Sequence, residues 1–225
     1  MTGSNGCAHH ISENISSALA LEAHHRIKNS LALVSAIVRL QEKYVVRQGE
    51  LISTNDVLEM LRALGAKIDA VSIFHELLSN EPNKTSVNLA DHLGTIFGRL
   101  VGSQLFTKQY KLIEHYAPDC SIPMEQVVPL TLFLIEAVTN AVKYAHPTGV
   151  QGIIQLSCLR RRDGTIVVEV ADDGIGFPED FDPATDGGVG FKVLRGLVQQ
   201  LDGTFVATST PLGVNLQIHL PKGAR

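Results

Sequence analysis

Apolar residues recur at helical spacing in two successive segments of the first third of the chain, and this pattern most constrains the fold. The first segment, about 17–48, contains no Pro or Gly, and its apolar row is Ile27, Leu31, Val34 and Val38. Gly49 ends it. The second segment begins near Ser53 or Thr54, and its row is Val57, Leu61, Leu64, Ile68 and Val71. Alternating steps of four and three place each row on one helix face, so the pattern predicts a helical hairpin.

Two helices leave much of this apolar surface without a cover. The first helix also carries Leu33, Ile37 and Leu40 on a different face from its main row. A second copy of the hairpin, completing a four-helix bundle, would cover both faces. We therefore expect a homodimer.

The periodicity changes after the polar link 83–86. The expected elements are helices over about 88–102, 124–145 and 189–201, and strands over 110–116, 152–159, 165–171, 203–209 and 213–220. Turn residues at Asp163-Gly164 and at 211–213 predict hairpins, so the sheet should be mixed and mainly antiparallel, with helices on one face. We expect a flexible N-terminus at 1–15, the helical hairpin at 16–84 and an α+β sandwich at 85–225.

Composition narrows the class of protein. The net charge is -4, and the basic residues form no cluster beyond 160–162, which argues against nucleic acid as a partner. The longest apolar stretch, 127–138, is interrupted by Pro129 and Glu136 and is short of the ~20 residues of a membrane span. The three cysteines have no metal or disulfide spacing. We expect a cytoplasmic protein without a membrane span or a secretion leader.

One histidine of the first helix is placed to face outward. At about 100° per residue, His25 lies roughly opposite the apolar row, whereas His24 lies within about 50° of it. Ala32 and Ala36 share the face of His25 and are small enough to let another protein approach the imidazole. A lone surface histidine is usually solvated, so this motif by itself supports no reaction.

A polar row follows on the long helix at 124–145. Steps of four and three place Glu136, Asn140 and Lys143 on one face, giving a carboxylate, an amide and an ammonium in sequence. This set suits a hydrated magnesium ion beside phosphates, because Mg²⁺ prefers oxygen ligands and keeps several waters. A solvated polar face is the alternative interpretation.

Two glycine-rich segments complete the candidate site. Asp172 ends an apolar strand and begins the sequence DDGIG, so its carboxylate could accept a hydrogen bond from an exocyclic amine such as that of adenine. GGVG at 187–190 enters the next helix, where free N–H groups favour an anion. The acidic segment 177–187 between them contains no Lys or Arg and is typical of a flexible lid.

Several of these motifs carry a resemblance to a known family. They are HHRIKNSLALVSAIVRLQ, IDAVSIFHELL, VNLADHL, PLTLFLIEAVTNAVKYAHP, VADDGIGFPEDFD and GGVGFKVLRGLVQQLDGTF, in this order. The chain resembles the catalytic core of two-component sensor histidine kinases, in the HWE-related group whose phosphoacceptor motif reads H-R-[IV]-K-N. The chain contains no Trp, which places it outside the strict HWE group.

The resemblance implies a dimerisation and phosphotransfer hairpin followed by an ATP-binding domain of the Bergerat fold, shared with gyrase, Hsp90 and MutL. It implies that His25 accepts the phosphoryl group and that Glu136 acts in catalysis through water and metal. The implied ATP and Mg²⁺ ligands are Asn140 for the metal, Lys143 and Tyr144 for phosphates, Asp172 with Gly174 and Gly176 for adenine, and Gly188 and Gly190 for the phosphate-binding backbone.

The implied function is an ATP-dependent histidine autokinase that phosphorylates a response-regulator receiver domain, with its signal supplied from outside the two catalytic modules. One alternative is a histidine phosphotransferase with a non-catalytic ATPase-like domain, and another is an anti-sigma or partner-switch protein of the same ATPase superfamily. Two positions depart from the family. Arg26 follows the phosphoacceptor where many kinases have an acid, and Val214 follows Gly213 where relatives often have Thr.

Overall fold

The computed structural model describes residues 24–25, 27–43, 45–46, 53–81, 84–101, 110–146 and 150–221. The described residues of 24–46 are helical, and we call them the N-terminal helix. The second helix is α2 (Thr54–Asn80). It begins at the predicted place, because the Ser53 hydroxyl caps it by accepting the Asp56 N–H at 3.1 Å. The predicted flexible terminus at 1–15, Arg26 and the Gly49 turn lie outside the described residues.

The N-terminal helix packs differently from the expectation. Ile37 is buried, and Leu33 and Leu40 pack against the core of the same chain. The prediction that a second copy is needed to cover this face was therefore wrong. In the main row Leu31 and Val38 are exposed, whereas Val34 also packs against this core. His24, predicted to lean towards packing, is exposed like His25.

The second domain contains the expected elements together with two short strands that were not expected. They are β1 (Ser86–Asn88), α3 (Leu89–Val101), β2 (Tyr110–Tyr116), β3 (Ser121–Pro123), α4 (Met124–Tyr144), β4 (Gly152–Arg160), β5 (Ile166–Asp172), α5 (Val189–Gln200), β6 (Thr204–Thr210) and β7 (Gly213–Leu220). The main sheet has the order β2-β4-β5-β7-β6. β2 and β4 are parallel, and the other neighbours are antiparallel. The predicted mixed, mainly antiparallel sheet is confirmed. The small β1–β3 pair was not predicted.

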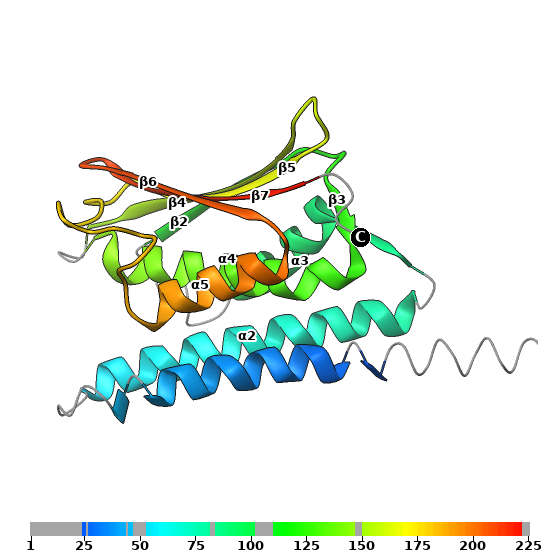
Figure 1. The fold of residues 1–225 in the computed structure, drawn as a ribbon, viewed down its shortest axis with the longest axis horizontal. Coiled ribbons are helices and arrows are strands. Elements are labelled where there is room, and N and C mark those ends of the chain that lie inside the picture. The colour runs from blue at the N-terminus through cyan, green and yellow to red at the C-terminus, as the bar shows by residue number, and fades with distance from the viewer. Residues whose placement is uncertain are drawn as a thin grey trace, which may run out of the picture.

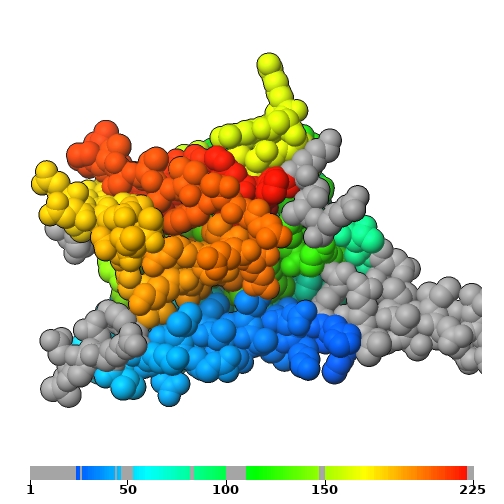
Figure 2. Space-filling view, in the orientation of Figure 1, coloured from blue at the N-terminus to red at the C-terminus, as the bar shows by residue number. Residues whose placement is uncertain are grey.

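The domain has two layers, a sheet and the helices α3, α4 and α5 on one of its faces (Figure 1). β4 shows why the sheet is covered on one face, because Ile154, Leu156 and Cys158 are buried whereas the residues between them are more exposed. The hairpin lies against the helical layer, with the N-terminal helix running along the base of the molecule (Figure 2). α2 therefore faces α4, the helix that carries the polar row.

α4 is the central helix of the core. Its residues from Val127 to Val138 are almost all buried, including Leu130, Phe133 and Ile135 at 0% exposure. The sequence predicted that the apolar stretch of this helix is too short to span a membrane. The whole helix is nevertheless long and apolar enough to do so, but 72% of its most apolar 18-residue window is buried inside the fold. A helix that is apolar nearly all round is also what the core of a globular domain requires.

Candidate functional site

Asp172 stands at the end of β5, held by two backbone amides. Its Oδ1 accepts the N–H of Gly174 at 3.0 Å and the N–H of Val214 at 3.2 Å. Burial raises the pKa of the Asp172 carboxyl, and the two N–H donors oppose that rise. No described residue donates to Oδ2, so this oxygen is available to an amino group of a ligand. The anchor at Val214 uses the backbone and needs no hydroxyl at that position.

Glycines bring the loops around Asp172 into contact. Gly213 has φ 134°, and a Cβ there would lie 1.9 Å from the Asp172 carbonyl oxygen, so the β6–β7 turn can approach β5 only without a side chain. Gly174 is buried against Ala145, at the end of α4. Gly176 lies against the Thr210 carbonyl. The first glycine segment thus joins β5 to the ends of α4 and β6.

The second glycine segment meets the polar row of α4. A Cβ on Gly190 would lie 2.7 Å from Glu136 Oε1 and 3.1 Å from Asn140 Oδ1. Glu136 is buried, and Asn140 Nδ2 is buried without a hydrogen-bond partner among the described residues. Gly188 is the N-cap of α5 and provides no side-chain cap, so the first N–H groups of this helix are open to an anion. The structure therefore assembles Glu136, Asn140 and Gly190 in one place.

Lys143 of the row and its neighbour Tyr144, both predicted to contact phosphates, point elsewhere. Lys143 Nζ lies 3.5 Å from Glu59 Oε2 of α2 and 5.7 Å from the centre of the Tyr144 ring. Tyr144 is 63% exposed. In this arrangement the Lys143 ammonium is engaged by the hairpin.

Lys67 of α2 is a site residue that the sequence reasoning missed. Its side chain is 0% exposed, and its Nζ lies 2.5 Å from Glu136 Oε2. The available signal was a second stripe on α2, in which Lys67 is the charged residue among Ala63, Ala66 and Ala70 at steps of three and four. A stripe of small residues indicates a face on which another helix can approach closely.

The segment 177–187, which we call the lid, is tied to α5. The rings of Phe177, Phe181 and Phe191 have centroids 4.7–5.7 Å apart. Arg195 donates to the carbonyl oxygens of Pro183 at 2.8 Å and Asp186 at 3.0 Å. These contacts give the lid a defined anchor on α5, which the prediction of a flexible segment did not include.

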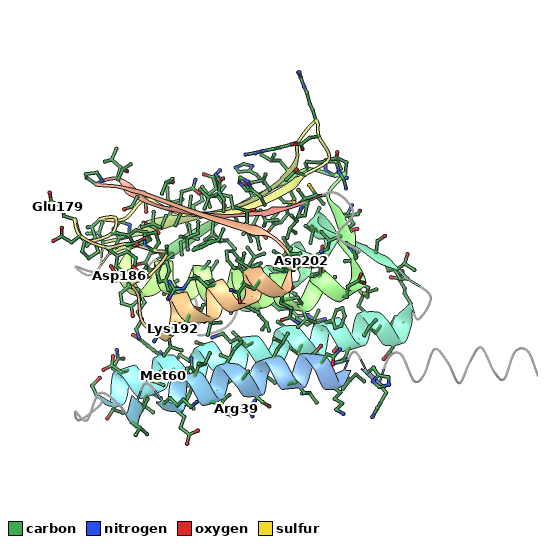
Figure 3. The ribbon with its side chains drawn as sticks, viewed as in Figure 1. Arg39, Met60, Glu179, Asp186, Lys192 and Asp202 are labelled. Carbon is green, nitrogen blue, oxygen red and sulfur yellow. The ribbon has the colours of Figure 1, made fainter. Side chains whose placement is uncertain are left out.

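The acidic residues of the lid are exposed, and Asp182 and Asp186 accept hydrogen bonds from the lid itself. Glu179 projects from its outer edge, and Lys192 lies on α5 above the part of α2 that carries Met60 (Figure 3). Within the described ranges, no three His, Cys, Asp or Glu residues are grouped to hold a metal ion. A metal in this site would depend on Asn140, Glu136 and the phosphates of a nucleotide.

His25 is far from these groups along the hairpin. The first described turn of the N-terminal helix, which carries His25, lies beside the end of α2, whereas the lid and the start of α5 lie over the start of α2 (Figure 1). His25 is exposed, as predicted. The structure thus brings Glu136 and Asn140 together with Gly190, and Asp172 together with Gly174 and Val214, but it leaves Lys143, Tyr144 and the predicted phosphoacceptor apart from them.

Comparisons with known proteins agree with this layout. Residues 22–104 match the family described as histidine kinase, and residues 125–224 match the family described as histidine kinase-, DNA gyrase B- and HSP90-like ATPase. Blue-light-activated histidine kinase 2 of Erythrobacter litoralis is 24% identical over 202 residues, which cover 89% of this chain and 56% of the relative. The sensor histidine kinase PdtaS of Mycobacterium tuberculosis is 25% identical over 207 residues, which cover 91% and 39%.

A solved structure supports the same relationship. The histidine kinase domain of a blue-light-activated histidine kinase of Erythrobacter litoralis superposes with a TM-score of 0.68 at 25% identity, covering 90% of this chain and 92% of that domain. The chain spans about half or less of the length of the two curated relatives named above. A histidine kinase region at 22–104 and an ATPase region at 125–224 follow each other in this chain. The chain therefore belongs to the HWE-related histidine kinases and contains their catalytic core.

Proposed function

We propose that the chain is an ATP-dependent autokinase that phosphorylates its own His25 and passes the phosphoryl group to an aspartate of a response-regulator receiver domain. One observation carries the proposal. Asp172, the Glu136–Asn140 row and the uncapped start of α5 converge in the ATPase domain of a chain that also presents an exposed histidine on a helical hairpin. A domain without nucleotide chemistry would have no need for the buried, unpartnered amide of Asn140.

Nucleotide binding follows from the positions of the polar groups. Asp172 Oδ2 accepts a hydrogen bond from the adenine amino group, and Gly174 and Gly176 shape its pocket by letting the loop pack closely against Ala145 and Thr210. The backbone N–H groups at Gly188 and Gly190 donate to phosphate oxygens, assisted by the positive end of the α5 dipole. Lys143 and Tyr144 reach the phosphates once Lys143 leaves Glu59.

Asn140 would hold Mg²⁺ through its amide oxygen, and Glu136 would orient a water of the ion. When bound, Mg²⁺ neutralises the charge that the transferring phosphoryl group develops. The side chains position the reactants: Asn140 fixes the position of the phosphates, and Glu136 accepts a hydrogen bond from water.

The transfer step uses a neutral imidazole nitrogen of His25 as nucleophile. An N–P bond forms to the γ-phosphorus while the bond to the β,γ-bridging oxygen breaks, ADP leaves, and the imidazole proton passes to solvent. The receiver aspartate then attacks the phosphohistidine, forming an acyl phosphate and restoring the imidazole. The exposure of His25 and of Ala32 on its face allows a receiver to approach.

The homodimer and the cellular setting are part of the proposal. The main rows of the hairpin leave Leu31, Val38, Val57, Leu61 and Ile68 exposed at 38–59%, and we call these five residues the hairpin row. An apolar row of this length is a surface that a second hairpin could cover. We place the protein in the cytoplasm, where ATP and receiver domains occur, with its signal coming from a sensor region or a separate protein.

Incubation of the chain with γ-labelled ATP and Mg²⁺ tests the reaction. We expect acid-labile label on the wild type, no label on His25→Ala or Asp172→Ala, and normal label on His24→Ala, the exposed neighbour that serves as the matched control. Label retained by His25→Ala would contradict the assignment. An unlabelled wild type that accepts label from a phosphorylated receiver would identify a phosphotransferase, and acid-stable label on a Ser or Thr of another protein would identify a partner-switch kinase.

A further inference from the structure

Two ion pairs connect α2 of the hairpin to the polar row of α4. Lys67 Nζ lies 2.5 Å from Glu136 Oε2, and Glu59 Oε2 lies 3.5 Å from Lys143 Nζ. α2 and α4 run antiparallel, so the start of α2 lies against the end of α4 (Figure 1). Both charged residues of the row are therefore engaged by the hairpin.

The inner pair is buried and incompletely compensated. Lys67 is 0% exposed, and no acceptor in the described part of the chain stands in hydrogen-bonding geometry to its Nζ, so the nearby charge of Glu136 is its main compensation. In such a pair, the free-energy cost of taking both charges out of water nearly cancels their attraction. Mutating one partner instead leaves an unpaired buried charge, which is costly. The contact is thus specific and still reversible.

The small residues beside Lys67 explain how the pair forms. Ala63, Ala66 and Ala70 share its face of α2 and are buried, which lets the two helices approach closely. The members of the hairpin row on α2 are Val57, Leu61 and Ile68, which are exposed at other positions of this helix, so docking on α4 does not use the surface assigned to the dimer. The two faces of α2 can therefore have separate roles.

This arrangement separates the reacting groups. Lys67 holds one oxygen of Glu136 while the other faces Gly190, and the turn that carries His25 lies at the far end of the hairpin from the lid. The ATPase domain could bind a nucleotide here, but it could not deliver the phosphoryl group to His25 of the same chain.

We propose that α2 holds the ATPase domain in a docked, non-transferring state, in which Lys67 is the positioning residue that occupies Glu136. Release of the Lys67–Glu136 and Glu59–Lys143 pairs then precedes phosphorylation of His25. The proposal rests on the proposed autokinase function. A signal that moves α2 relative to α4 would free both charges of the row at once.

The test compares full-length variants. Lys67→Met keeps the length of the side chain and removes its charge, and Glu59→Gln breaks the outer pair without touching either residue of the row. Lys111→Met, at an exposed position of β2, is the matched control for loss of a lysine. Three quantities are measured: the initial rate of His25 labelling at saturating Mg·ATP, the Kd of a non-hydrolysable ATP analogue, and amide hydrogen exchange in residues 59–67.

We expect Lys67→Met to raise the labelling rate at least about tenfold, because a buried Glu136 without its partner disfavours docking. Glu59→Gln should raise the rate about 1.5- to 5-fold, as expected for a partly exposed pair. Both should speed hydrogen exchange in 59–67 and lower the Kd, because undocking frees Lys143 to reach the phosphates. Lys111→Met should change none of the three quantities.

A lower rate in Lys67→Met with an unchanged Kd would overturn the proposal, since Lys67 would then act in transfer itself. Unchanged rates and exchange in both variants would also overturn it. If Lys67→Met does not fold, the labelling rate and the hydrogen exchange of Glu59→Gln decide between the two outcomes. A wild type that binds the analogue but labels no histidine would instead defeat the autokinase function, and the exchange data would still report whether the pairs hold α2 on α4.

Discussion

His92 should make the protein lose stability in mild acid. This residue of α3 is 3% exposed, and its Nε2 lies 3.1 Å from Thr131 Oγ1 of α4. The Thr131 hydroxyl donates to the Val127 carbonyl at 2.7 Å. Its oxygen is therefore the acceptor for His92, so Nε2 carries a proton, and the lowered pKa of His92 keeps the ring neutral at pH 7. Acid forces a second proton onto a ring that the core surrounds.

The size of the effect follows from the shift in pKa. Burial, with a smaller contribution from the Lys84 charge, lowers the pKa of His92 from 6.5 to about 4. Between these values the unfolded chain binds a proton that the folded chain does not, so stability is complete above pH 6.5 and falls as the pH decreases. Linkage over pH 7 to 4.5 gives a loss of about 2.4 kcal/mol in the free energy of unfolding.

Urea unfolding at pH 7.0, 5.5 and 4.5, followed by circular dichroism, measures this loss. Because carboxylates also titrate in this range, the wild type is compared with His92→Gln, whose amide can donate to Thr131 but does not titrate. The advantage of the wild type over the variant should shrink by about 2.4 kcal/mol between pH 7.0 and 4.5. Equal losses in both proteins would refute the assignment of a buried neutral imidazole.

Three further predictions concern the site and the hairpin. Gly213→Ala should weaken binding of an ATP analogue at least about tenfold by calorimetry, because its Cβ would lie 1.9 Å from the Asp172 carbonyl oxygen. Gly196→Ala is the control and should bind normally, because a Cβ there has no atom within 4 Å. Arg195→Met should make the lid at least about tenfold more sensitive to limited proteolysis, since two charge-assisted hydrogen bonds are lost. Leu61→Glu should convert the dimer to a monomer in light scattering, and a wild type that stays monomeric at high concentration would exclude the dimer.

Most of the fold could be predicted from local sequence signals. Ser53 and Asp56 mark the start of α2, and the predicted spans 110–116 and 213–220 coincide with β2 and β7. The β1–β3 pair was missed because three-residue strands carry almost no alternation. The packing of the N-terminal helix was misjudged because periodicity shows that Ile37 lies on an apolar face but not which element covers that face.

The site also contains residues that the sequence could predict and residues that it could not. Glu136, Asn140 and the glycines stand on single elements with recognisable spacing, and the structure assembles them. Lys67 and Glu59 gain their roles only through the docking of α2 on α4, a contact between segments about 70–85 residues apart. No local pattern encodes that contact. The anchor between Asp172 and the Val214 amide was equally hidden, because it depends on a backbone group whose side chain is irrelevant.

The strand order has a consequence for how the ATPase domain is made. β7 follows β6 in the chain but lies between β5 and β6 in the sheet, and it supplies the Val214 amide that holds Asp172. During synthesis, β6 has no neighbour to pair with and the Asp172 carboxylate lacks one of its donors until residues 213–220 have left the ribosome. A nascent chain can therefore form its helical hairpin long before it can bind a nucleotide. Any nucleotide contact that relies on the doubly anchored Asp172 carboxylate therefore forms only after β7 has joined the sheet.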